Sequence, residues 1–203
     1  MRKIAALCLA SALLVSCVGI DSALTIRDNG SGTLVLTYRV SQLVADLGDS
    51  RSEKGIVPLP LSRSDFERSL EGAKGKVRLA RFDRSENEKD ITIRAEIAFE
   101  SLDALSQVEA FRDAELKATS SGTRHTFSQL IARAPEEPVS EDTLRMIDSF
   151  FDGYNLTFAI EVPQPIQANS LGTVSSNKRV LTYTTNIKDI ERTKSDIVLT
   201  VGW

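Results

Sequence analysis

The chain has few of the residues that build metal centres and disulfides, and no excess of basic charge. Its 203 residues include two cysteines and one histidine, too few nitrogen and sulfur ligands for a usual zinc site. Lys and Arg number 25 against 28 Asp and Glu, so nothing in the net charge attracts nucleic acid. No Gly-rich phosphate loop follows a strand and opens a helix. We therefore expect no nucleic-acid partner, no metal and no cofactor.

Long apolar runs are also scarce, and the one that exists stands at the N-terminus. Arg2 and Lys3 precede it, and residues 4–15 are apolar except for Ser11. About a dozen residues are too few to span a bilayer as a helix, which takes roughly 20. A basic start, a short apolar centre and a small-residue end are typical of a secretory signal peptide. We assign residues 1–16 to such a peptide.

The run ends in Leu14-Val15-Ser16-Cys17, which resembles a bacterial lipobox. The resemblance implies cleavage between Ser16 and Cys17 and fatty acylation of the cysteine, with palmitate as a typical chain. Two or three acyl chains anchor a protein stably where one binds only marginally. Val18 stands where an aspartate would favour the inner membrane, so an outer membrane is favoured. The alternative is an ordinary secretory signal with a chance cysteine.

Residues 17–203 are expected to form a single domain that has no disulfide. Cys8 leaves with the signal peptide and Cys17 carries lipid, so no cysteine pair remains. Without Arg2 and Lys3 the remainder carries 23 basic and 28 acidic residues. Its stability must come from a hydrophobic core, for which this length is sufficient.

Alternating apolar and polar residues predict strands throughout the chain. Asn29-Gly30 and Ser120-Ser121-Gly122 supply turn residues between two of the expected hairpins. The segments expected to form strands are 20–28, 33–40, 76–83, 90–99, the two arms of 112–133, 154–162, 179–186 and 196–201.

Helices are expected in four shorter segments. Residues 41–47 form one, and 48–61 read as a loop. Ser64 with Glu67 fits a capping box, Ser101 can cap a short helix, and 141–151 has apolar residues at helical spacing. Hairpins and short helices in mixed order predict an α+β fold, with a mostly antiparallel β-sheet and short helices packed on one face.

Two stretches, 22–40 and 91–105, resemble the bacterial lipoproteins related to LppM, the DUF3153-type domain family. The positions that carry the resemblance are Asp28, Gly30, Ser31, Gly32, Phe99, Ser101, Leu102 and Leu105. The resemblance implies an α+β fold and a location in the cell envelope, and it brings no catalytic residues. Residues 111–150 look like an insertion relative to that family.

Three motifs could be mistaken for chemistry. His125 lies in an expected strand without a nucleophile elbow, which favours a surface histidine over a catalytic triad. Asp28-x-Gly30-x-Gly32 offers one carboxylate where calcium needs several, which favours a hairpin turn. A solvated turn is the favoured interpretation of the charged cluster formed by Glu86, Glu88 and Asp90 with Arg84 and Lys89. A catalytic pair of carboxylates is the alternative, because such pairs meet in space and need not be close in sequence.

These observations favour a lipid-anchored, non-catalytic envelope protein that binds a partner or organises the surface. The alternative is a lipid- or amphiphile-binding domain with an internal apolar cavity. The side chains that would line such a cavity are Phe99, Leu144, Phe150, Phe151 and Phe158. These side chains are more often ordinary core residues. A hydrolase that uses carboxylates has the least support. We assign no catalytic residue, and the one assigned site is the cleavage and lipidation site at Ser16 and Cys17.

The anchor can be tested by Cys17→Ala. We expect this variant to remain uncleaved or mislocalised, because the acceptor sulfur for the lipid is missing. Labelling cells with a clickable fatty acid measures the modification directly. Equal labelling of the wild-type chain and the variant would contradict the lipobox interpretation.

Overall fold

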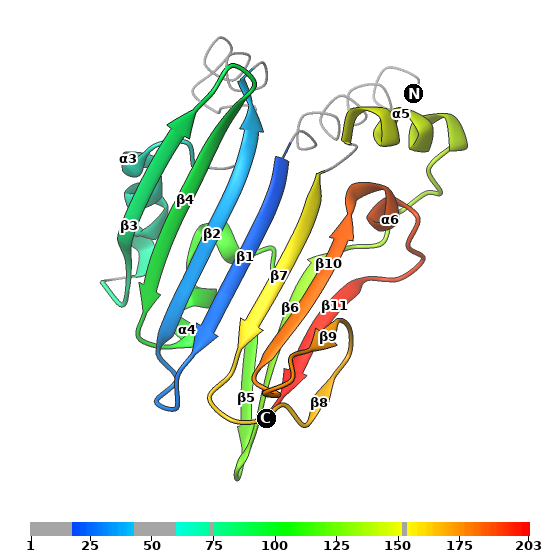
Figure 1. The fold of residues 1–203 in the computed structure, drawn as a ribbon. Helices are drawn as coiled ribbons and strands as arrows, with labels where there is room; N and C mark the ends of the chain where they lie inside the picture. Colours follow the sequence, from blue (N-terminus) through cyan, green and yellow to red (C-terminus); the bar gives the residue numbers. More distant parts are fainter. Residues whose placement is uncertain (1–17, 43–59, 74, 152–153) are drawn as a thin grey trace.

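The computed structural model describes residues 18–42, 60–73, 75–151 and 154–203, which form two β-sheets and several short helices (Figure 1). The larger sheet has seven strands in the order β3-β4-β2-β1-β7-β10-β9. The smaller has four strands in the order β5-β6-β11-β8. The α+β class expected from the sequence is confirmed, whereas the second sheet was not expected.

The strands of the larger sheet are β1 (Val18–Ile26), β2 (Gly32–Ser41), β3 (Val77–Glu86), β4 (Asp90–Phe99), β7 (Asn155–Glu161), β9 (Thr173–Val174) and β10 (Val180–Asn186). Those of the smaller sheet are β5 (Lys117–Ser121), β6 (Arg124–Ala132), β8 (Ala168–Asn169) and β11 (Ile197–Gly202). β1 and β7 pair in parallel, whereas the other strand pairs are antiparallel. The hairpins β1–β2, β3–β4 and β5–β6 agree with the expected ones.

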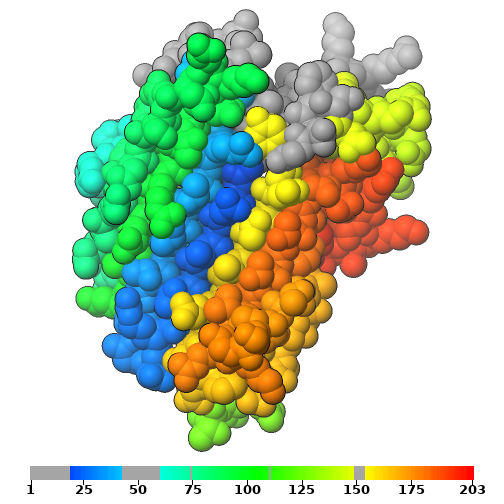
Figure 2. Space-filling view, in the orientation of Figure 1, coloured from blue at the N-terminus to red at the C-terminus, as the bar shows by residue number. Residues whose placement is uncertain are grey.

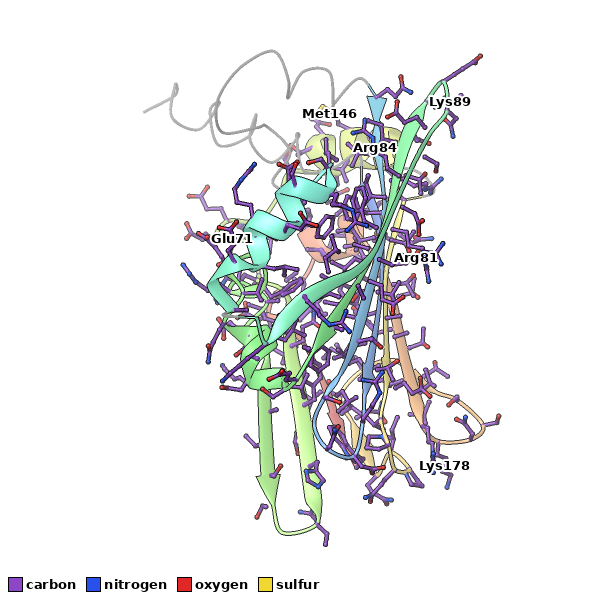
Figure 3. The ribbon with its side chains drawn as sticks, turned by 90° about the vertical axis from the view of Figure 1, so that its left-hand side faces the viewer. Glu71, Arg81, Arg84, Lys89, Met146 and Lys178 are labelled. Carbon is purple, nitrogen blue, oxygen red and sulfur yellow. The ribbon has the colours of Figure 1, made fainter. Side chains whose placement is uncertain are left out.

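The described helices are α3 (Arg63–Leu70), α4 (Leu102–Ser106), α5 (Glu141–Phe151) and α6 (Ile187–Glu191). The short 3-10 turns η1 (Glu71–Ala73) and η2 (Glu109–Phe111) follow α3 and α4. α3 and α4 lie on the same side of the larger sheet as the smaller sheet (Figure 3). The opposite, outer face shows its strands at the surface from β4 across to β10 (Figure 2).

The alternation along β4 explains how one face of the larger sheet is buried. Ile91, Ile93, Ala95, Ile97 and Phe99 are all buried, whereas the residues between them are half-buried or exposed. One hydrophobic cluster joins these side chains to residues of the smaller sheet, including Phe127, Leu199 and Val201. The core therefore lies between the two sheets.

Tyr38 fixes the connection that leads into α3. Its side chain is buried, and its ring centroid lies 6.5 Å from that of Phe66. Its hydroxyl donates to the Pro60 carbonyl. Burial, followed by the nearby charge of Asp65, raises the pKa of Tyr38. The hydroxyl therefore stays protonated and serves as a donor.

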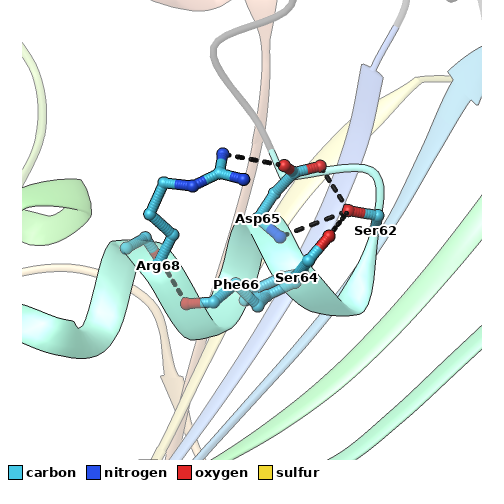
Figure 4. A network of polar contacts seen from close by, with 6 residues as sticks. Ser62, Ser64, Asp65, Phe66 and Arg68 are labelled. Carbon is cyan, nitrogen blue, oxygen red and sulfur yellow. Dashed lines mark hydrogen bonds and ion pairs between the residues drawn. The ribbon is translucent and has the colours of Figure 1, made fainter.

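The expected start of α3 was wrong by two residues. Ser62, not Ser64, is the N-cap, and its Oγ accepts a hydrogen bond from the Asp65 amide at 3.2 Å (Figure 4). Arg68 in turn donates to the Asp65 carboxylate at 3.2 Å. Ser62 and Asp65 have the same three-residue spacing as Ser64 and Glu67, so the pattern alone did not separate the two caps.

Several further expectations concern particular segments. The helix expected at 41–47 and the loop at 48–61 fall largely outside the described residues. Residues 111–150, expected as an insertion, supply β5, β6 and α5, and β6 pairs along its length with β11. These residues therefore contribute a central strand of the smaller sheet.

The face assignment of β4 gives a stability prediction. Ile97 is fully buried, so Ile97→Ala should lower the free energy of unfolding by about 2–5 kcal/mol through lost burial and an unfilled cavity. Glu96 lies on the outer face, and Glu96→Gln should stay within about 0.5 kcal/mol. Chemical denaturation measures both. A large loss for Glu96→Gln with none for Ile97→Ala would reverse the two faces.

Candidate binding site at the distal end

The larger sheet has two ends that differ in what they carry. At the end where β1 begins, which we call the proximal end, Val18 pairs with Val40 and the Gln42 amide donates to the Lys89 carbonyl at 2.9 Å. At the other, distal end, β1 turns into β2. Figure 3 shows Lys89 and Lys178 at these opposite ends.

The β1–β2 turn at the distal end is held by its own backbone. The Arg27 amide donates to the Ser31 carbonyl at 2.8 Å, and the Gly30 amide donates to the Arg27 carbonyl at 2.9 Å. Gly30 has a φ of 78°, which glycine adopts without strain. This confirms the turn expected from Asp28-x-Gly30-x-Gly32. Directly after it, a Cβ on Gly32 would lie 2.0 Å from the Thr25 carbonyl oxygen, so this position requires glycine.

A pocket of about 370 Å³ opens beside this turn, and we call it the end pocket. Its buried floor is hydrophobic and comes from Ile26, Leu102 and Trp203. The rest of the wall comes from the β1–β2 turn, the start of α4, the β5–β6 hairpin and the segment after β7. These other lining residues are Arg27, Asp28, Gly30, Ser101, Asp103, Ala118, Thr119, Ser120, His125, Thr126, Pro163 and Gln164.

His125 joins the hairpin to the floor of the end pocket. Its ring stacks on Trp203 with centroids 5.7 Å apart and planes inclined by 21°. Its Nδ1 lies 2.8 Å from the Ser120 Oγ, directly across the hairpin. The histidine lies in a strand, as the sequence favoured, and it is half-buried and forms part of the pocket wall.

Charges at the rim of the end pocket come from Arg27, Asp28 and Asp103, all on exposed residues. Asp103 accepts a hydrogen bond from Gln107 Nε2 at 3.2 Å. Within the described residues, neither carboxylate forms an ion pair at 4.0 Å or less. Two carboxylates and one guanidinium leave the rim with a small negative bias.

The Ser120–His125 pair is the part of this site that comes nearest to catalytic chemistry. In a Ser–His–Asp triad, a carboxylate orients the imidazole through its second ring nitrogen. Among the described residues, no carboxylate is hydrogen-bonded to His125, and the serine lies on an exposed hairpin. The arrangement is better suited to holding a ligand between an apolar floor and a polar rim.

A second pocket of about 370 Å³ lies on the other side of the same turn, on the outer face. Its charged lining residues are Arg27, Lys76, Arg78, Glu96 and Glu100. Arg27 belongs to both pockets. The cations and carboxylates nearly balance, so this pocket has little charge preference.

The other residues singled out from the sequence lie elsewhere. Glu86 pairs with Arg84 at 2.6 Å at the exposed end of β3, and in the turn that follows, the Asn87 side chain accepts from the Lys89 and Asp90 amides at 2.9 Å. This is the solvated turn that the sequence favoured. Ser16 and Cys17 lie outside the described residues.

Of the residues proposed to line an apolar cavity, Phe99, Leu144 and Phe158 do not line the end pocket. Phe99 and Leu144 are buried, and Phe158 packs against the core. The side chains of Phe150 and Phe151 are not among those described. The end pocket was missed from the sequence, although Ser120 and His125 flank Gly122 at the spacing of a cross-strand pair.

Among the described residues, no group of three or more His, Cys, Asp and Glu side chains is placed to hold a metal ion. None of the helices described is long and apolar enough to cross a membrane.

Comparison with known proteins gives little that bears on function. No protein-family profile matches the chain, and no curated protein is significantly similar to it. The NMR structure of the folded domain of LppM from Mycobacterium tuberculosis is similar, with a TM-score of 0.45 and 9% identity over 92% of this chain and 88% of that one. A likeness this low carries no argument, so membership of the LppM-related family stays a prediction.

The floor and the rim of the end pocket should respond differently to substitution. Trp203→Ala should lower the free energy of unfolding by about 3–5 kcal/mol, because it removes a buried aromatic side chain. Asp28→Asn and Gln164→Ala, on exposed residues, should stay within about 0.5 kcal/mol. Chemical denaturation followed by circular dichroism measures all three. A loss at the rim equal to that at Trp203 would mean that the rim holds the fold together and is not available to a ligand.

Proposed function

We propose that this chain is a lipid-anchored, non-catalytic binding protein of the bacterial cell envelope, which presents the end pocket away from the membrane. The observation that carries the proposal is the position of β1. Its first residue, Val18, directly follows the cysteine of the lipobox, and its last residue, Ile26, lines the end pocket. A single strand thus connects the anchor to the pocket.

The length of β1 sets the height of the pocket. Nine residues at roughly 3.3 Å each give about 30 Å between the ends of the strand. Because the strand begins at the residue after Cys17, little free chain separates the acyl group from the sheet. The proximal end, with the β3–β4 turn, would lie near the lipid headgroups, and the distal end would point toward partners.

The character of the end pocket supports recognition. Ligand pockets typically enclose about 300–1,000 Å³ and combine an apolar lining with a few placed polar groups. The end pocket, at about 370 Å³, has this combination. A protein held by lipid needs no more than such a site and a stable fold to act as a binding module. Val18 at the position after the cysteine supports an outer-membrane location over an inner one.

Site-specific photocross-linking in intact cells tests the function. A photoreactive residue at Gln164, an exposed residue of the distal rim, is compared with one at Lys89, exposed in the proximal turn. We expect defined protein or glycan adducts from Gln164 and mainly lipid adducts from Lys89. Because both positions are exposed, they are matched for accessibility. Lipid adducts of equal yield at both positions, with no other product at Gln164, would contradict the proposal.

A further inference from the structure

The smaller sheet has an open edge at β5. β5 is the terminal strand of the order β5-β6-β11-β8, and all five of its residues are exposed. The β5–β6 hairpin extends past the distal end of the larger sheet (Figures 1 and 3). An exposed edge strand offers unpaired backbone groups to which another extended segment can add.

α4 packs near β5, but β5 has fewer of the features that block a sheet edge than β3, one of the two edge strands of the larger sheet. β3 has a register shift between Leu79 and Arg81, and it carries the ion pairs Arg81–Asp83 and Arg84–Glu86, each at 2.6 Å. Bulges and charges are the usual means of blocking an edge. The only charged residue of β5 is Lys117, its pairing with β6 is regular, and its other residues are small and neutral.

The hydrogen-bond pattern shows which backbone groups of β5 face outward. His125 exchanges both backbone hydrogen bonds with Trp203, at 2.9 and 3.0 Å, so its N–H and C=O point away from β5. Its partner Ser120 is therefore in a non-hydrogen-bonded pair, and Ala118, two residues earlier, follows the same alternation. Backbone groups along β6 point alternately toward β11 and toward β5. The Leu130 amide is one of those on the β5 side, and it donates to the Ala114 carbonyl at 2.8 Å. Ala118 and Ser120 thus present their N–H and C=O groups to the open edge.

The same two residues also face the end pocket. Ala118 and Ser120 lie opposite Phe127 and His125, and all four side chains are on the inner side of the sheet, since Phe127 is fully buried. A strand added at β5 would place alternate side chains on this inner side. One of them would enter the end pocket, where its stem would lie on the apolar floor and its tip between Asp28 and Asp103.

These observations lead to one partner. We propose that β5 receives an extended segment of another protein by strand addition, and that a lysine or arginine of this segment fills the end pocket. The long apolar stem and cationic head of such a side chain fit an apolar floor and a rim whose two carboxylates outnumber its one guanidinium, that of Arg27. This proposal rests on the proposed function, because it names the class of partner that the end pocket would bind.

The anchor argues against a second copy of this chain as the occupant. Antiparallel pairing of β5 with itself requires a twofold axis normal to the sheet, which turns the second molecule end to end. β5 and β1 both run toward the distal end (Figure 1). The second molecule would therefore hold its own Cys17 away from the membrane that anchors the first.

The experiment uses the full chain, purified from membranes in detergent, and a labelled peptide, acetyl-Thr-Val-Thr-Lys-Thr-Val-Thr-amide. Fluorescence anisotropy gives its affinity and that of the peptide with glutamate in place of lysine. We expect the lysine peptide to bind about tenfold or more tightly than the glutamate peptide, from the loss of a charge-assisted contact. The double variant Asp28→Asn with Asp103→Asn should remove this preference.

Ala118→Pro tests strand addition itself. Proline removes an outward N–H without removing a bond to β6, so peptide binding should weaken about tenfold or more. Ala118→Ser keeps the amide at the same position, so it should retain more peptide binding than Ala118→Pro does. Circular dichroism shows whether Ala118→Pro is folded. If it is not, NMR shifts of the Ala118 and Ser120 amides in the wild type, on addition of the lysine peptide, give the answer independently.

Three outcomes would overturn the inference. The first is that neither peptide binds at about 1 mM, a concentration at which even a weak specific complex forms. The others are unchanged peptide binding to folded Ala118→Pro, and a concentration-dependent dimer that forms through β5. Because binding is measured in detergent, these outcomes do not depend on the membrane anchor. Failure of acylation at Cys17 would instead contradict the proposed function and leave the peptide result standing.

Discussion

The pairing of β1 with β2 on one side and β7 on the other is the interaction on which the rest of the structure depends. β1 is the central strand of the larger sheet, and its parallel pairing with β7 joins the N-terminal hairpins to the C-terminal strands. The inward residues Leu24 and Ile26 are buried in the cluster that also holds Phe127 and Leu199 of the smaller sheet. Without this strand, the two halves of the larger sheet and the floor of the end pocket would separate.

The proposed function follows from where this strand starts and ends. A flexible linker between an acylated cysteine and a domain lets the domain reorient freely. A strand that begins at the residue after that cysteine restricts this motion. Under the proposed function, the sheet would act as a spacer of fixed length, with the proximal turn at the headgroups and the end pocket at the far end. The open edge of β5 lies at that same far end, so main-chain and side-chain recognition would occur together.

Local patterns in the sequence were sufficient for the hairpins, the buried face of β4 and the α+β class, because alternation and turn residues act within a few residues of one another. They were not sufficient for the second sheet, since β6 pairs with β11 across more than sixty residues. The end pocket was missed for the same reason: Ile26, Leu102 and Trp203 meet only in the folded chain. The cap of α3 was misplaced because two equivalent serine–carboxylate spacings overlap there.

The central claim is that β1 separates the anchor from the end pocket, and the height of the pocket above a membrane measures it most directly. The acylated chain is placed in vesicles whose headgroups carry an energy acceptor, with a donor fluorophore at Gln164 or, in a matched sample, at Lys89. The account predicts efficient transfer from Lys89 and a Gln164 donor that lies about 30 Å farther from the headgroups, the length of β1. Equal transfer from both positions would show that the sheet lies flat on the membrane and would contradict the account.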